Sequence, residues 1–235
     1  MTLYELMIKA NDYLIKGGTL NDVHKAKIVK QFMDGISTRE TAERFYNGVK
    51  FPKNTDETGR QMYPIFYIPP YNGGKKLKTV LGQTPGTHIL SANMYELEIL
   101  RLLHMFAPDN PDVRSMITRT LERLKSTCYG KDGCGVGECY DASIVVLRFL
   151  AAVAPDDRRW INERIRTYYE HYDEKKRPWY IKWYFWLCLS ELPHDIAEPH
   201  IKRYGDEINA QLTRTSDGST IRYALLKKLC KIFAI

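Results

Sequence analysis

Apolar residues recur at helical spacing through most of the chain, and between residues 93 and 212 they form three similar units. In each unit a stripe of apolar residues ends at a proline, at Pro108, Pro155 or Pro193, and a second stripe follows. A proline ends a helix because it has no backbone N–H to donate, and a polar residue beside it can cap the next helix. The pattern therefore predicts three antiparallel helical hairpins.

The turns of the first two units share their sequence as well as their position. The residues from Arg101 to Asp109 and those from Arg148 to Asp156 both begin with arginine and end with Ala-Pro-Asp, 47 positions apart. Stacked hairpins with a period of about 40 to 47 residues, each burying its apolar face on its neighbours, characterise HEAT and armadillo arrays. Residues 93–212 thus resemble the HEAT/armadillo-like superfamily, which implies an all-α fold of stacked antiparallel hairpins, an α-solenoid.

An α/α toroid is the alternative architecture, because it also repeats helical hairpins and often joins them through glycine-rich loops such as residues 130–137. Three hairpins are too few to close a typical ring. Further helices are expected at residues 3–15, 21–33 and 38–46, so a small or partial ring stays open as an alternative. The open stack is the preferred prediction.

The remaining residues divide into three segments of one domain that spans residues 1–235. Residues 1–50 hold the expected N-terminal helices. Residues 51–92 are rich in proline and glycine, and an Asn-Gly-Gly turn signal predicts a small extended or β-hairpin insertion near residues 60–85. Residues 213–235 form a terminal amphipathic helix without a polar cap, which either folds back on the preceding hairpin or docks a second copy in a homodimer.

Composition and charge limit the partners without naming one. A net charge of +7 divides into +5 for residues 1–92, −1 for residues 93–172 and +3 for residues 173–235, so an acidic protein or nucleic-acid partner is permitted but not required. The N-terminus lacks the pattern of a secretory signal, and no apolar stretch has the length of a membrane span. Five cysteines are an odd, sparse set that fits a reducing compartment. We expect a cytoplasmic protein that does not bind membranes.

Three of the four tryptophans, Trp179, Trp183 and Trp186, share one stripe of a short segment that is apolar on every side. A buried core helix is the favoured interpretation. In the functional alternative, Trp179 and Trp183 line a concave surface and stack on a flat or cationic ligand. The basic residues expected beside them are Lys75, Lys76, Lys78, Lys175, Lys176 and Arg177.

Carboxylates near helix starts are the candidates for acid–base chemistry. Glu96, Glu138 and Asp141 would need a second carboxylate within about 5 to 10 Å and a pKa raised by burial to act as a general acid or base. Ordinary solvent-exposed acids are the preferred interpretation. The equivalent arginines Arg101 and Arg148 are expected to pair with such acids of an adjacent unit.

Cys128, Cys134 and Cys139 are the candidates for a metal site, because thiolates suit tetrahedral zinc. Their spacing lacks the C-x2-C pairs of zinc knuckles and ribbons, so unligated thiols are preferred, and no metal or cofactor is expected. No His-Glu-x-x-His, Gly-x-Ser-x-Gly or P-loop motif is present.

Three function classes remain. The leading hypothesis is a binding module that holds a protein or nucleic acid on a concave basic and aromatic surface. The second is an enzyme on a helical-repeat or α/α-toroid scaffold, either DNA-glycosylase-like or a hydrolase or lyase, and it rests on analogy of fold. The third is a structural protein that oligomerises through its C-terminal helix.

Overall fold

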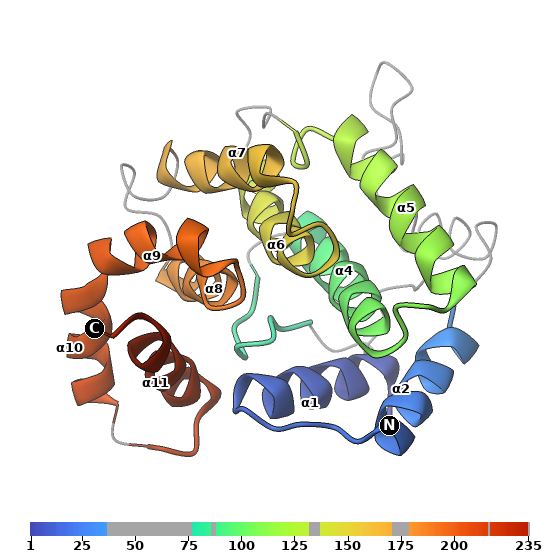
Figure 1. The fold of residues 1–235 in the computed structure, drawn as a ribbon, viewed down its shortest axis with the longest axis horizontal. Coiled ribbons are helices and arrows are strands. Elements are labelled where there is room, and N and C mark those ends of the chain that lie inside the picture. The colour runs from blue at the N-terminus through green and yellow to red at the C-terminus, as the bar shows by residue number, and fades with distance from the viewer. Residues whose placement is uncertain (37–76, 86–87, 132–136, 171–178, 216, 235) are drawn as a thin grey trace.

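The computed structural model describes residues 1–36, 77–85, 88–131, 137–170, 179–215 and 217–234. Within these ranges the chain forms helices and no strands, so an all-α fold is confirmed for the described part (Figure 1). None of these helices is long and apolar enough to cross a membrane. The helices are α1 (Leu3–Ile15), α2 (Asp22–Asp34), α4 (His88–Phe106), α5 (Pro111–Ser126), α6 (Gly137–Val153), α7 (Arg158–Tyr168), α8 (Trp179–Leu189), α9 (His194–Arg203), α10 (Gly205–Arg214) and α11 (Ile221–Phe233).

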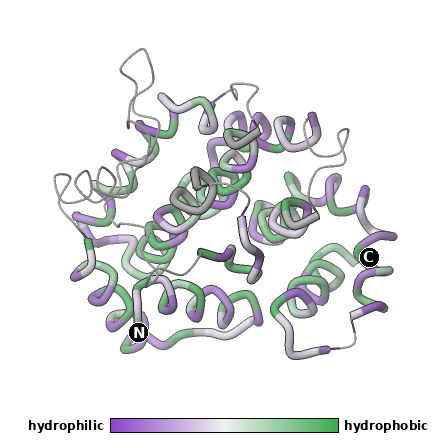
Figure 2. The backbone as a smooth tube through the Cα atoms, turned by 180° about the vertical axis from the view of Figure 1, so that it is seen from behind, coloured by the Kyte–Doolittle hydropathy of each residue, from purple (hydrophilic) through white to green (hydrophobic). Residues whose placement is uncertain are grey.

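The pairs α4–α5, α6–α7 and α8–α9 occupy the positions of the three predicted hairpins, and the helices of each pair contact one another. Polar residues near the prolines cap the second helices of the first two hairpins, whereas α9 starts at Pro193 without a side-chain cap. The Asn110 side chain accepts hydrogen bonds from the first amides of α5, and the Asp157 side chain accepts one from the Trp160 amide of α7. Hydrophobic and hydrophilic residues alternate along the outer helices α5 and α7 (Figure 2), and the buried residues recur at helical spacing on each.

The contacts between helices run in a closed circuit. α4 packs on α6, α6 on α8 and α8 on α9, while α9 and α10 pack on α11, α11 on α1, and α1 on α4. The first and last helices are therefore neighbours, as Figure 1 shows at its lower edge. Three leucines of α11, Leu225, Leu226 and Leu229, are fully buried. The C-terminal helix thus folds back on the protein's own helices, which is the first of the two outcomes expected for it.

Residues 77–85 lie in the middle of the circuit (Figure 1). Leu77, Val80 and Leu81 are buried there, and the Thr79 amide donates to the Gln83 carbonyl at 2.7 Å across a turn. Gly82 takes a φ of +81° in this turn, a conformation that a residue with a Cβ rarely adopts. This part of the predicted insertion is a turn without a strand, and residues 60–76 of the insertion lie outside the described residues.

α8 is a core helix, as its apolar pattern predicts. Phe185 and Leu187 are fully buried, Trp186 is 1% exposed and Trp183 is 8% exposed. The ring of Phe185 stacks on Tyr168 of α7 with 3.7 Å between centroids, and Trp186 lies edge-on to Tyr204. The aromatic cluster of the sequence therefore joins α7, α8 and the end of α9 in one core.

Candidate functional site

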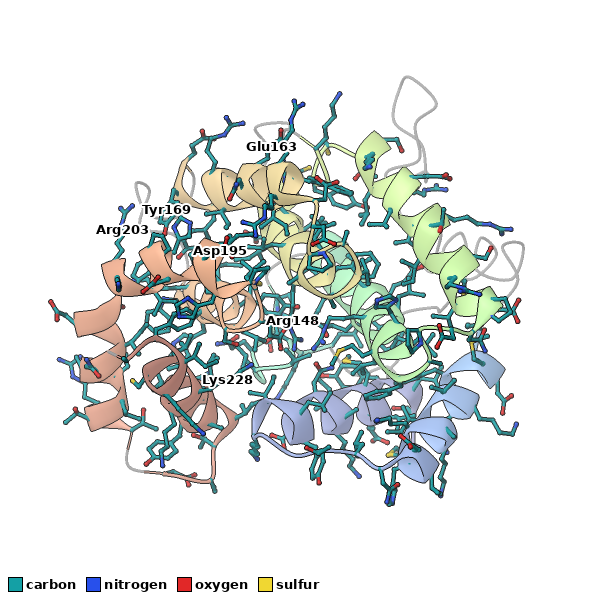
Figure 3. The ribbon with its side chains drawn as sticks, in the orientation of Figure 1. Arg148, Glu163, Tyr169, Asp195, Arg203 and Lys228 are labelled. Carbon is teal, nitrogen blue, oxygen red and sulfur yellow. The ribbon has the colours of Figure 1, made fainter. Side chains whose placement is uncertain are left out.

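Charged and polar side chains from five helices meet in the middle of the circuit, and we call this group the central ion network. Figure 3 shows Arg148 in the middle of the molecule and Lys228 beside α11. The network comprises Asn11 of α1, Glu98 and Arg101 of α4, Arg148 of α6, Tyr184 of α8, Glu191 of the turn after α8, and Lys228 of α11.

Arg148 is the hub of this network. Its Nη1 donates to Glu98 Oε1 at 2.6 Å, while its Nε and Nη2 donate to the two oxygens of Glu191 at 2.9 and 2.8 Å. Burial disfavours its charge, but the Glu191 and Glu98 carboxylates outweigh burial and raise its pKa well above the usual value. One guanidinium thus ties α6 to α4 and to the α8–α9 turn. Arg148 pairs with acids of adjacent units as predicted, but Glu98 lies in the middle of α4 and not at a helix start, and Arg101 pairs with Glu98 of its own helix.

Glu98 accepts hydrogen bonds from three elements. Besides Arg148, the Tyr184 hydroxyl donates to Glu98 Oε1 and Arg101 Nε donates to Oε2 at 3.3 Å. Arg101 Nη2 also donates to Asn11 Oδ1 at 3.0 Å, which links α4 to α1. Burial, followed by the charge of Glu98, raises the pKa of Tyr184 well above its usual value, so the hydroxyl stays protonated and remains a donor.

Glu191 and Lys228 form the outer edge of the network, where the Glu191 side chain is 20% exposed. Burial raises the pKa of Glu191, but the charges of Arg101 and Arg148 and the Arg148 hydrogen bond outweigh it and lower the pKa to about 2. Burial lowers the pKa of Lys228, whose Nζ donates to Ser190 Oγ at 3.3 Å. With Glu191 ionised and Tyr184 protonated, neither group exchanges a proton near neutral pH, and the network fixes helices in place.

The carboxylates proposed for acid–base chemistry do not lie where the preferred interpretation put them. Glu96 is fully buried and Asp141 is 7% exposed, so the expectation of solvent-exposed helix-start acids is wrong for both. The side chain of Glu138 lies outside the described residues. Burial, followed by the charge of Glu96, raises the pKa of the Tyr129 hydroxyl well above its usual value, which places Glu96 near the loop after α5.

Most of the predicted binding residues lie outside the described residues. These are Lys75, Lys76, Lys175, Lys176 and Arg177, together with the side chain of Trp179. Lys78 is exposed, and its amide donates to the Tyr4 hydroxyl at 2.8 Å. Trp183 packs edge-on against Trp186 at 5.2 Å between centroids, and the Arg222 guanidinium lies 5.5 Å from its ring centroid. Arg222, on α11, is a neighbour of Trp183 that the sequence analysis did not identify.

α11 carries a basic surface opposite its buried side. Between Ile221 and Phe233 it has four basic residues and no acidic one. Lys227 and Lys231 are exposed one turn apart, and Lys227 Nζ lies 5.6 Å from the ring centroid of Tyr223. Within the described part of the chain, neither lysine forms an ion pair, whereas Lys182 pairs with Glu207 at 3.0 Å. We call Tyr223, Lys227 and Lys231 the α11 basic face.

The cysteine candidates are only partly described, since Cys134 lies outside the described residues. The Sγ atoms of Cys128 and Cys139 are 3.1 Å apart, and both side chains are thiols. In the part of the chain that the structure describes, no group of three or more His, Cys, Asp or Glu residues is arranged to hold a metal ion.

Comparisons with protein-family models, with curated proteins and with solved structures gave no match. We therefore infer the function from the arrangement of the protein's own side chains. The sequence contains one signal of the central ion network, the equivalence of Arg101 and Arg148. It gave no signal for Tyr184 or Glu191, because their partners lie far away in the sequence.

Proposed function

We propose that this protein is a binding module of repeated helical hairpins that holds single-stranded nucleic acid on the α11 basic face. The observation that carries the proposal is the row of Tyr223, Lys227 and Lys231, with two exposed lysines and no acidic residue on the whole helix. Lysines neutralise backbone phosphates without regard to sequence, and an adjacent aromatic ring gives a base a surface for stacking.

The spacing of the lysines is unfavourable in the unbound protein. Lys227 and Lys231 stand four residues apart on one helix, about 6 Å along its axis. Like charges at this spacing destabilise a helix by about 0.2 to 0.5 kcal/mol. A phosphate group between the two ammonium groups removes this repulsion, so the helix is no longer destabilised when nucleic acid is bound. Departures from local sequence rules of this kind concentrate at functional sites.

The scaffold holds the basic face rigidly. The closed circuit of helix contacts supports a ring of the α/α-toroid type over an open stack, because α11 is held by α1, α9 and α10. Lys228, on the neighbouring side of α11, donates to Ser190 at the end of α8. A surface fixed in advance loses little conformational freedom when a ligand binds, which favours affinity.

The enzyme alternative needs a general acid or base among the carboxyl groups of the chain. A general acid that works near neutral pH needs a raised pKa. The pKa values of four described carboxyl groups are lowered by basic partners or by hydrogen bonds, those of Glu191, Asp195, Glu198 and Asp217. Groups of this kind remain charged and serve as ion-pair partners.

Fluorescence anisotropy with labelled single-stranded DNA and RNA tests the proposal. The binding constant is measured from low to physiological salt for the native protein, for Lys227→Gln/Lys231→Gln, and for the control Lys27→Gln/Lys30→Gln in α2. Each single-strand phosphate contact contributes about 0.7 to the slope of log K against log salt, so the α11 variant is expected to lower the slope by about 1.4. The control changes the net charge equally at exposed sites on another helix and is expected to bind normally.

Two results would overturn the proposal. One is the absence of binding by the native protein at low salt, and the other is an equal loss of affinity in both double variants. Polyglutamate is added as a competitor in the same assay. If it displaces the nucleic acid as well as unlabelled single strands do, the partner is an acidic protein and the nucleic-acid assignment fails.

A further inference from the structure

The thiols of Cys128 and Cys139 are brought together from the loop after α5 and the first turn of α6. Cys128 follows the end of α5, where Thr127 is the capping residue, and Cys139 lies in the first turn of α6. Their Sγ atoms are 3.1 Å apart. Cys128 is exposed and Cys139 is 4% exposed, so one thiol of the pair is open to a reagent in solution and the other lies behind it.

The residues that follow Cys128 are held in place by α7. Arg164 Nη1 donates to the Tyr129 carbonyl at 3.0 Å, and Trp160 Nε1 donates to the Gly130 carbonyl. Gly130 sits so close to the end of α5 that a Cβ there would lie 2.0 Å from the Leu124 carbonyl oxygen. The backbone beside Cys128 is therefore fixed by buried contacts, and the approach of the two sulfurs belongs to the packing of α5, α6 and α7.

The separation of the sulfurs distinguishes a disulfide from a metal site. Two thiolates on one tetrahedral zinc, each about 2.3 Å from the metal, lie about 3.8 Å apart. The 3.1 Å between Cys128 and Cys139 is shorter than that. A disulfide needs about 2.05 Å, so a movement of about 1 Å joins the two sulfurs, whereas binding zinc requires them to separate.

We propose that Cys128 and Cys139 are a redox-active pair that a hydroperoxide oxidises to a disulfide. The Cys128 thiolate attacks the peroxide, the O–O bond breaks, and a sulfenic acid forms, while the leaving hydroxide of hydrogen peroxide is protonated to water and the leaving alkoxide of an organic hydroperoxide to an alcohol. The Cys139 thiolate then attacks the Cys128 sulfur, the S–O bond breaks, and water leaves as the S–S bond forms. The two sulfurs give two electrons to the peroxide, and a dithiol reductant restores both thiols.

The test uses the reduced full-length protein, hydrogen peroxide in stoichiometric amount, alkylation of the remaining thiols and mass spectrometry. The expected result is a loss of about 2 Da per chain before alkylation and two fewer alkyl groups after it, both reversed by dithiothreitol, with a link between the tryptic peptides 126–131 and 132–148. Because Cys134 and Cys139 share the second peptide, the experiment is repeated on Cys134→Ser, which is expected to keep the link. Cys230→Ser, which changes a thiol on α11, is the matched control and is also expected to keep it.

The exposed-site variant Cys128→Ser is expected to abolish the link without affecting folding, and Cys139→Ser is expected to trap Cys128 as a sulfenic acid that dimedone labels. A link that disappears in Cys134→Ser, or a native protein that oxidises to sulfinic acid without losing two thiols, would overturn the proposal. Mapping of the native protein decides between these results even if the buried variant Cys139→Ser does not fold.

Discussion

Replacing Arg148 by methionine is the sharpest test of the central ion network. Methionine keeps a long, flexible chain but removes the charge and the three hydrogen bonds to Glu98 and Glu191. The side chain of Arg148 is 1% exposed, as is that of Glu98, so water cannot replace the lost partner. Removing one partner of a buried ion pair typically costs about 3 to 5 kcal/mol in the free energy of unfolding.

The lowered pKa of Glu191 shows how strongly the network stabilises its ionised carboxylate. Arg101 and Arg148 lower it from 4.5 to about 2 against the effect of burial. At 1.36 kcal/mol per pKa unit, the ionised carboxylate contributes about 3 kcal/mol to the free energy of unfolding at neutral pH. Arg101 contributes to this stabilisation and remains in the variant, so the cost of breaking a buried pair sets the expectation of about 4 kcal/mol for Arg148→Met, which corresponds to a fall in melting temperature of roughly 8 to 16 °C for a chain of this length.

Urea unfolding followed by far-ultraviolet circular dichroism measures the change, with calorimetry for the melting temperature. Arg159→Met is the matched control, since the side chain of Arg159 is 91% exposed and pairs with Glu163 on the same helix at 3.1 Å. An exposed pair of this kind contributes less than about 1 kcal/mol. The reasoning is refuted if Arg148→Met and Arg159→Met lose the same stability, or if Arg148→Met loses less than about 1 kcal/mol.

Three further outcomes follow from the same geometry. The folded-state pKa of Glu191 is lowered, so its contribution is fully present above pH 4.5 and is lost as the pH falls toward 2; urea unfolding should show the stability gap between native protein and Glu191→Gln closing across this window. Tyr184→Phe removes one donor to Glu98 and should cost about 1.5 to 3 kcal/mol with an unchanged denaturant slope. Oxidation of Cys128 and Cys139 closes a short loop, so the peroxide-treated protein should gain about 2 to 3 kcal/mol, measured by urea unfolding without reductant.

The local features of the fold could be predicted from the sequence. Helical periodicity and the prolines at 108, 155 and 193 depend on neighbouring residues, and each predicted hairpin is a contacting pair of helices. The equivalence of Arg101 and Arg148 also indicated ion pairs between units, and Arg148 does pair with Glu98. Each of these features can be recognised from short segments of the sequence, without knowledge of the fold.

The long-range features could not be predicted in this way. The contact between α1 and α11 joins the two ends of the chain, and no sequence period reports it. Glu96 and Asp141 look like exposed helix-start acids in the sequence, but both are buried, and α4 begins at His88, eight residues before Glu96. The neighbours that cover the two acids lie far away in the sequence. The contact of Arg222 with the ring of Trp183 could not be predicted either, because α8 and α11 meet only in the folded chain.

The central ion network also explains how α8 can have a single orientation. Its side chains are apolar on every side, so burial of apolar area favours many rotations of this helix almost equally. The Tyr184 hydroxyl can reach Glu98 in only one of them, and the bidentate contact of Arg148 with Glu191 fixes the end of α8 at the same time. Buried ion pairs add little net stability compared with apolar residues of the same size, but they restrict the packed helices to one relative orientation. We therefore expect apolar replacement of the whole network to leave a stable protein in which α8 no longer holds one rotation.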